Sequence, residues 1–269
     1  LTPFFARLAQ EGIIHQEEQV AGLAPARAIR LPAENWGQLA QQARQQGCRW
    51  LACWGDDQDN DVVVQAAFEK DGGYLVARTA VAKNSPVLPS HTPHFPAANR
   101  PERHIQDLYG VAFSDHPDTR RWTRHRAWKS SQYPLRKDFP AAGTPPVQTP
   151  PDDAYKFLFA HGAGVYEIPV GPVHAGIIEP GHFRFQAVGE MVLNLEERLG
   201  YVHKGTEKIA EGRDPQALAR LAARVSGDTT VAHSWAACMA MEKAATVQVP
   251  ERALFLRAIM AERERIANH

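Results

Sequence analysis

Five polar side chains that could do chemistry lie close together in the C-terminal half: Arg224, Ser226, Asp228, Thr229 and His233. An arginine can hold an anion or a carboxylate through two hydrogen bonds, and a histidine can relay protons or bind a metal near neutral pH. Ser226 and Thr229 offer only neutral hydroxyls, which are poor ligands for soft metal ions. The segment therefore offers groups for anion binding and proton relay, but no thiolate that could hold a soft metal ion.

A structural role is the alternative for the same residues. Ser and Asp are strong helix N-caps, so Ser226 and Asp228 can end one helix and begin the next. His233 would then be a hydrogen-bonded group in a core helix, and Arg224 would form an ion pair. Both roles are compatible, because a helix N-terminus has free backbone N–H groups and a positive dipole end that suit an anionic or carbonyl-bearing ligand.

Composition excludes several classes of protein. The chain has 269 residues, with 30 basic and 30 acidic side chains, so nothing favours nucleic-acid binding or a polybasic membrane anchor. No apolar run approaches the ~20 residues of a membrane-spanning helix. Cys48, Cys53 and Cys238 form no disulfide or metal-binding pattern, so a reducing compartment is expected. The chain begins at Leu1 and ends in an apolar periodic run, so a longer native chain is expected.

Residues 1–140 predict a mixed α/β domain. Helices are expected over 2–10, after Pro32, and over 101–109, where Gly110 ends the last one. Strands are expected over 27–31, 49–55, 62–68 and 74–81. The short connections between the last three strands favour an antiparallel sheet.

A Pro-rich linker over 141–153 separates this domain from a second one over 154–269. Strands are expected over 155–161, 165–170, 182–188 and 191–199, with a tight hairpin at Gly189-Glu190. Helices follow over 203–211, from Pro215 to about 225, from 228 or 229 to about 245, and from Pro250 onward. The predicted class is α+β, in which a small antiparallel sheet leads into a helical-bundle core.

Several stretches resemble known redox proteins. Residues 102–113 (ERHIQDLYGVAF), 116–120 (HPDTR) and 134–139 (PLRKDF) resemble the signature of the small peripheral-arm component of respiratory complex I, its C-type subunit. Residues 171–176 (GPVHAG), 200–208 (GYVHKGTEK), 224–233 (RVSGDTTVAH), 250–253 (PERA) and 264–269 (ERIANH) resemble the D-type subunit of complex I and the large subunit of energy-converting [NiFe] hydrogenases. Joined in one chain, they resemble the fused large subunit of formate hydrogenlyase-type hydrogenases.

The resemblance has departures at the positions that matter most. The hydrogenases hold nickel with two cysteines at the positions of Ser226 and Thr229, and a second pair lies near the end of the family's chain, beyond His269. The D-type subunit of complex I supports its quinone with a histidine and a tyrosine, at positions that are Ile178 and Gly227 here. A nickel–iron centre is therefore not expected, and the quinone ligands do not match either.

The resemblance also implies two proton-transfer residues. Glu179 lies where hydrogenases place a glutamate near the metal, and a carboxylate in a dry cavity can shuttle protons near neutral pH. His174 lies in the Gly-Pro loop of the same stretch. The alternative for Glu179 is an exposed loop residue before Pro180.

The implied function is that of a peripheral-arm subunit of a membrane-associated redox complex, on the cytoplasmic side of the inner membrane. The chain would form the electron-acceptor cavity next to an iron–sulfur small subunit that resembles the B-type subunit of complex I, would contact membrane-arm subunits, and would carry no cofactor itself. Two alternatives stay open: a genuine [NiFe] hydrogenase large subunit, and a non-catalytic coupling subunit.

A basic, aromatic segment is interpreted as a docking arm for the iron–sulfur partner rather than a nucleic-acid site. It comprises Arg120, Arg121, Trp122, Arg124, Arg126, Trp128, Arg136 and Lys137.

Overall fold

The computed structural model describes residues 1–20, 22–124, 128–143, 155–173 and 179–269. The chain divides into two compact units. Residues 1–51, 65–79 and 204–269 form one unit, and residues 52–64 and 80–203 form the other. Of the predicted linker, residues 144–153 lie outside the described residues, and the predicted domain boundaries stay a prediction.

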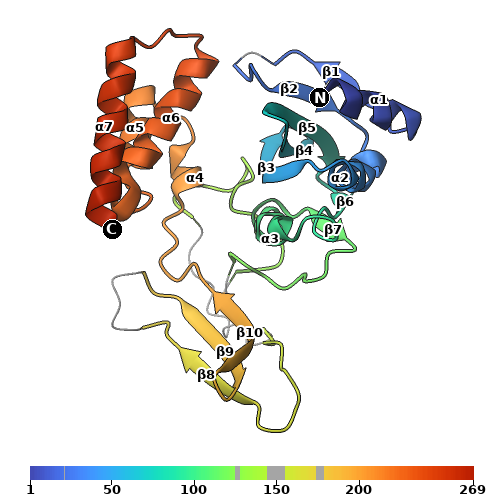
Figure 1. The fold of residues 1–269 in the computed structure, drawn as a ribbon, viewed down its shortest axis with the longest axis vertical. Coiled ribbons are helices and arrows are strands. Elements are labelled where there is room, and N and C mark those ends of the chain that lie inside the picture. Colours follow the sequence, from blue (N-terminus) through green and yellow to red (C-terminus); the bar gives the residue numbers. More distant parts are fainter. Residues whose placement is uncertain (21, 125–127, 144–154, 174–178) are drawn as a thin grey trace. The chain divides into compact units, whose positions relative to one another are not determined.

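A five-stranded sheet dominates the N-terminal half, with strand order β1-β2-β5-β4-β3 (Figure 1). Strands β3, β4 and β5 are neighbours joined by two-residue turns, a connection that antiparallel strands allow and parallel strands do not. The parallel pairing of β2 with β5, in which Ile29 lies opposite Ala77, was not predicted. The five strands are β1 (Gln16–Glu18), β2 (Arg27–Arg30), β3 (Arg49–Gln58), β4 (Asp61–Lys70) and β5 (Gly73–Ala82).

Two helices supply much of the core of this half. Helix α1 (Thr2–Gln10) buries Phe4 and Leu8, four residues apart and so on one face of the helix. Helix α2 (Trp36–Gln45) follows the short turn η1 (Ala33–Asn35) and buries Trp36 and Leu39 completely. Both helices start near a proline, as the sequence predicts.

Helix α3 (Asn99–Tyr109) follows the short turn η2 (Pro96–Ala98) and carries the first part of the 102–120 signature. Gly110 ends it with a φ of 81°, and a Cβ atom at this position would lie 2.6 Å from Cζ of Tyr133. Glycine is therefore required both by the backbone conformation and by the close approach of Tyr133. Strand β6 (Val87–Pro89) precedes α3 in the sequence and β7 (Ala112–Ser114) follows it. The two strands form a short parallel pair.

The second sheet has three antiparallel strands: β8 (Tyr166–Val170), β9 (His182–Val188) and β10 (Met191–Arg198). The predicted hairpin at 189–190 is confirmed, since Val188 pairs with Met191. The predicted strand over 155–161 is wrong. Its backbone is held by side chains instead, because Glu196 accepts the N–H of Leu158 and Gln186 accepts that of Ala160.

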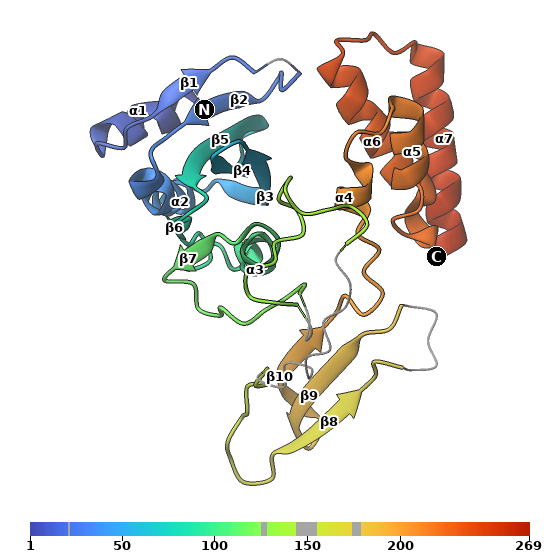
Figure 2. The same ribbon diagram turned by 180° about the vertical axis from the view of Figure 1, so that it is seen from behind.

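The C-terminal part is helical, and α5 (Pro215–Ala222), α6 (Thr230–Ala244) and α7 (Glu251–Asn268) lie side by side (Figures 1 and 2). Helix α4 (Thr206–Ala210) precedes them, and the turn η3 (Gly227–Thr229) opens α6. The predicted cap at Asp214 is confirmed, because its carboxylate accepts the N–H of Ala217 at 2.9 Å. The α+β class is likewise confirmed. None of the described helices is both long enough and apolar enough to cross a membrane.

Candidate functional site

The turn between α5 and α6 carries the predicted cavity residues. Arg224 and Asp228 are exposed, whereas Ser226, Thr229 and His233 are partly buried. The Oγ1 atom of Thr229 lies 2.7 Å from Nδ1 of His233, and the carbonyl oxygen of Thr229 lies 3.0 Å from the same nitrogen. The spacing of four residues brings Thr229 and His233 together on the first turn of α6.

The expected capping of α6 by Ser226, Asp228 or Thr229 is wrong. Neither Ser226 nor Thr229 forms a side-chain cap hydrogen bond. Glu264, on α7, does so instead: its two carboxylate oxygens accept the N–H groups of Val231 at 2.6 Å and Ala232 at 3.0 Å. Sequence reasoning missed this contact, because the residues that it joins are more than thirty positions apart.

Two further side chains hold the same turn. Asn268 donates through Nδ2 to the carbonyl oxygen of Asp228, and Lys204 donates through Nζ to the carbonyl oxygen of Val225 at 3.1 Å. Lys204 belongs to the 200–208 stretch, and Glu264 and Asn268 belong to the 264–269 stretch. Three stretches that carry the family resemblance therefore meet at residues 225–232.

The donor atoms of this turn do not fit a nickel ion. Hydroxyls are neutral and hard, whereas nickel in such a site is held by anionic, soft thiolates. The hydroxyl of Thr229 is also engaged with His233. Among the described residues, no cluster of three or more His, Cys, Asp or Glu side chains is arranged to hold a metal.

Of the two predicted proton-transfer residues, Glu179 and His174, the structure describes only Glu179. Glu179 is exposed and lies just before β9, in the other compact unit from the 224–233 turn. His174 lies outside the described residues, and so does Ile178. The cavity shared by Glu179 and the 224–233 turn stays a prediction.

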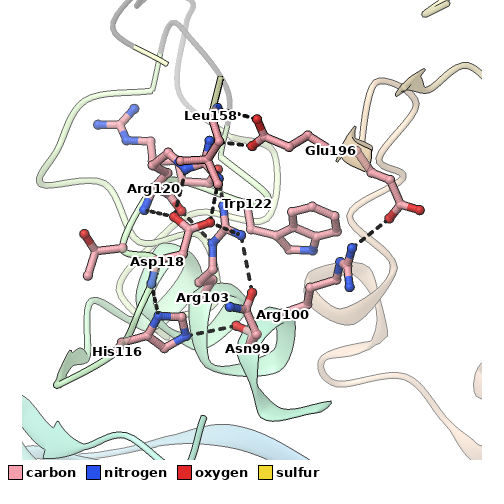
Figure 3. A network of polar contacts seen from close by, with 12 residues as sticks. Asn99, Arg100, Arg103, His116, Asp118, Arg120, Trp122, Leu158 and Glu196 are labelled. Atoms are coloured by element: carbon pink, nitrogen blue, oxygen red, sulfur yellow. Dashed lines mark hydrogen bonds and ion pairs between the residues drawn. The ribbon is translucent and has the colours of Figure 1, made fainter. Parts of the chain in front are cut away.

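A second polar network is built from the 102–120 signature (Figure 3). Arg103, on α3, is buried. Its guanidinium donates to the carbonyl oxygens of Arg120 at 2.8 Å and Arg121 at 3.4 Å. The Nη1 atom of Arg103 also lies 3.0 Å from Oδ2 of Asp118. The helix α3 thereby fixes the chain that follows β7.

Arg120 joins this network to the second sheet (Figure 3). Its guanidinium pairs with both oxygens of Asp118, at 2.9 and 2.8 Å, and with Oε1 of Glu196 on β10 at 2.6 Å. It also donates to the carbonyl oxygen of Lys156 at 2.7 Å. The Asp118 carboxylate raises the pKa of Arg120 above its usual range, so this arginine is a permanent charge that ties both segments together.

Tyr155 adds an aromatic contact to the same junction. The guanidinium carbons of Arg198 and Arg120 lie 3.6 and 4.8 Å from its ring centroid, which is within the range of cation–π attraction. Nearby, Arg100 pairs with Glu197 at 2.9 Å. The described residues on either side of the 144–154 segment are therefore joined by contacts between charged and aromatic side chains.

Glu102 is a fully buried carboxyl group in the first turn of α3. It accepts hydrogen bonds from Ser90 Oγ at 2.6 Å, from the backbone N–H of His91 at 2.6 Å and from Thr92 Oγ1 at 2.7 Å. Burial raises the pKa of Glu102, against the opposite effect of these hydrogen bonds.

This burial predicts a specific pH dependence. A carboxyl group whose pKa is higher in the folded than in the unfolded state stabilises the fold fully below the unfolded value, and this contribution is lost as pH rises through the folded value. We therefore expect the unfolding free energy of the wild type, relative to Glu102→Gln, to fall as pH rises above about 4.5, the ordinary value for glutamate. Urea unfolding across this range measures it, with the exposed Glu190→Gln as control. A difference that rises with pH would contradict the prediction.

Most described arginines of the predicted docking arm are used inside the chain. Arg124 donates to the carbonyl oxygens of Lys129 at 3.1 Å and Ser130 at 3.3 Å, and Arg136 donates to that of Tyr109 at 2.8 Å. Both guanidinium groups lie over the ring of Tyr133. These contacts give the arm its shape, and Arg126 lies outside the described residues. Docking of a partner on this arm stays a prediction.

Comparison with known families gives matches to two separate parts of the chain. Residues 29–145 match the family described as "Respiratory-chain NADH dehydrogenase, 30 Kd subunit". Residues 204–269 match the family described as "Nickel-dependent hydrogenase". The second match begins at Lys204 and includes Glu264 and Asn268, the three residues that hold the 225–232 turn.

Among similar proteins, formate hydrogenlyase subunit 5 of Escherichia coli (strain K12) is 39% identical over 198 residues, which cover 73% of this chain and 35% of that protein. Hydrogenase-4 component G of the same organism is 36% identical over 228 residues, which cover 82% of this chain and 41% of that protein. The C/D fusion protein of NADH-quinone oxidoreductase from Phocaeicola vulgatus is 33% identical, with corresponding shares of 72% and 40%.

The chain thus spans well under half the length of these relatives. Both family matches and all three relatives agree with the resemblance seen in the motifs. The chain belongs to the superfamily of fused C/D-type large subunits that unites energy-converting, formate hydrogenlyase-type [NiFe] hydrogenases with respiratory complex I, and it lacks the cysteine pair at positions 226 and 229.

Proposed function

We propose that this chain is a peripheral-arm subunit of a membrane-associated redox complex, and that its 224–233 turn lines the cavity where electrons reach their acceptor. The observation that carries the proposal is the convergence of Lys204, Glu264 and Asn268 on residues 225–232. Two separate stretches of the chain, 200–208 and 264–269, hold one short turn in place, although that turn has no thiolates. Such support is expected of a site that must be preorganised.

The side chains of the turn suit proton-coupled reduction of an organic acceptor. Arg224 is exposed and offers hydrogen bonds to a carbonyl or an anionic oxygen. Thr229 engages Nδ1 of His233, so proton exchange with a ligand would use Nε2. In this proposal electrons arrive from an iron–sulfur cluster on a partner, and His233 delivers a proton to the reduced acceptor. The proton-transfer roles of Glu179 and His174 stay predictions.

All cofactors lie outside this chain in this proposal. The iron–sulfur cluster belongs to a partner similar to the B-type subunit of complex I, and membrane-arm subunits anchor the complex on the cytoplasmic side of the inner membrane. Nickel–iron chemistry does not fit the hydroxyls of Ser226 and Thr229. The names of the relatives, which include both hydrogenase and quinone oxidoreductase subunits, support a redox role in either case.

A non-catalytic coupling subunit is the second candidate. The observation that favours it is that the polar groups of the turn satisfy one another: Thr229 with His233, and the α6 N–H groups with Glu264. A turn of this kind can transmit a conformational change without binding an acceptor.

Substitution of His233 separates these two functions. Positioned proton transfer contributes roughly 10²–10⁴-fold to a rate, so we expect His233→Gln in the native complex to slow the reduction of a water-soluble quinone at least tenfold. Reduction of the iron–sulfur clusters by dithionite should be unchanged. The exposed Arg252→Gln on α7 serves as control. A quinone rate equal to that of the wild type would reject the acceptor site and favour the coupling subunit.

A further inference from the structure

The N-terminus of α6 is capped from a different helix. Helix α6 begins at Thr230, so Val231 and Ala232 are its second and third residues. A helix leaves the N–H groups of its first turn without intrahelical partners, and an N-cap side chain usually binds those of the second or third residue. Here the carboxylate of Glu264 binds both, at 2.6 and 3.0 Å.

The two helices are joined at a second point, one turn further along α7. Asn268 lies four residues after Glu264, on the same face of α7, and donates to the carbonyl oxygen of Asp228 in η3. Glu264 therefore satisfies donors of the turn while Asn268 satisfies an acceptor. Glu264 binds N–H groups and Asn268 binds a carbonyl oxygen, so the two side chains together fix both the position and the direction of the backbone between residues 228 and 232.

Because Glu264 caps α6, the side chains of the turn do not cap it. Ser226 and Thr229 are residue types that normally cap helices, yet neither forms a side-chain cap hydrogen bond here. The α6 N-terminus is therefore capped by Glu264 and not by the side chains at positions 226 and 229.

We propose that Glu264, assisted by Asn268, is a positioning residue that caps α6 from α7 and thereby holds the 226–233 segment in its binding shape. The carboxylate occupies the positive end of the α6 dipole, where an anion is stabilised. An acceptor bound at this turn would therefore meet Arg224 and the Thr229–His233 pair rather than the helix N-terminus. This corrects the expectation that the N-terminus itself receives an anionic ligand.

Amide hydrogen exchange in the full-length chain tests the cap directly. A hydrogen bond to a charged group contributes roughly 1.5–3 kcal/mol, so we expect Glu264→Ala to speed exchange at Val231 and Ala232 by about tenfold to a hundredfold. Glu264→Gln retains one acceptor oxygen and should fall between the wild type and Glu264→Ala. The matched control is Glu262→Gln on the same helix, which breaks only an exposed pair with Arg265 and should leave both amides unchanged.

A second measurement, by nuclear magnetic resonance, follows the shape of the turn independently of any activity. We expect the ¹⁵N resonances of the His233 ring to shift in Glu264→Ala and to return toward the wild type in Glu264→Gln, because the Thr229–His233 contact depends on the α6 N-terminus. A variant that merely loosened the whole chain would change the exchange of amides throughout α5 and α7 as well. Unchanged exchange at Val231 and Ala232 in Glu264→Ala, or an effect equal in Glu262→Gln, would overturn the inference.

Only the consequence for catalysis rests on the proposed function. In the native complex Glu264→Ala should lower the quinone-reduction rate at least tenfold, with Glu264→Gln restoring part of it. If exchange and the His233 resonances respond while this rate does not, the positioning role of Glu264 stands and the acceptor site is rejected. If the rate falls with no change in exchange or in the resonances, the positioning role is rejected.

Discussion

Replacement of Asp107 by alanine is expected to lower the free energy of unfolding by roughly 3–5 kcal/mol. Asp107 is fully buried in α3. One of its oxygens, Oδ2, accepts the backbone N–H groups of Trp122 at 2.7 Å, Thr123 at 2.7 Å and Arg124 at 3.1 Å. Alanine leaves three donors in a buried region without an acceptor, and unsatisfied buried donors each cost about 1–3 kcal/mol.

Urea unfolding of the two proteins measures this effect. Asp107→Asn keeps one amide oxygen in nearly the same place, so it should lose less stability than Asp107→Ala. The exposed Asp138→Ala is the control and should change the unfolding free energy by less than about 0.5 kcal/mol. A loss below about 1 kcal/mol for Asp107→Ala would show that the 122–124 backbone finds other acceptors.

Replacement of Arg120 by alanine is expected to cost about 2–4 kcal/mol, because it leaves Asp118 and Glu196 without their shared cation. The side chain of Glu196 is only 7% exposed, while that of Arg120 is 23% exposed. The expected loss is therefore below the full penalty for a deeply buried pair. Arg120→Lys retains the charge but not the planar fork, so it should restore only part of the stability.

A double-mutant cycle assigns this loss to the junction between the two segments. We expect Arg120→Ala and Glu196→Gln to couple by about 1–3 kcal/mol in urea unfolding. Arg49→Ala is the matched control, since Arg49 pairs with Glu69 at 3.3 Å while its side chain is 69% exposed, and surface pairs contribute at most about 1 kcal/mol. If Arg120→Ala costs no more than Arg49→Ala, the network does not hold the segments together.

Local signals in the sequence predicted local structure well. Asp214 followed by Pro215 predicts the start of α5, Gly110 predicts the end of α3, and Gly189-Glu190 predicts the β9–β10 hairpin. In each case the deciding interaction joins residues that are close in sequence. The same is true of Thr229 and His233, whose contact follows from their spacing on one helix.

Interactions between distant residues were the ones that sequence reasoning missed. Residues 155–161 have a strand-like pattern, but Glu196 and Gln186 take the N–H groups that another strand would have used. The cap of α6 comes from Glu264 rather than from the serine or threonine beside it. A short motif indicates that such residues matter, but it does not say which partner each one binds.

The 102–120 signature illustrates the difference between a motif and its role. Glu102, Arg103, Asp107 and Arg120 carried the resemblance to the C-type subunit of complex I, yet their individual roles could not be assigned from the motif. In the structure all four bind backbone groups or other charged side chains of the same chain. Their contacts are those of a scaffold that shapes the segment between α3 and the second sheet.

In the proposed function, the 224–233 turn lies beside an iron–sulfur cluster of a partner protein. The most direct test attaches a nitroxide at position 227, an exposed glycine of the turn, through an introduced cysteine in a chain whose Cys238 is replaced by serine. Electron paramagnetic resonance then follows the spin relaxation of the nitroxide in the native complex, before and after reduction of the clusters by dithionite. The labelled chain without its partners is the control. We expect faster relaxation when the clusters become paramagnetic, in the complex only; identical relaxation in the oxidised complex, the reduced complex and the isolated chain would contradict the claim.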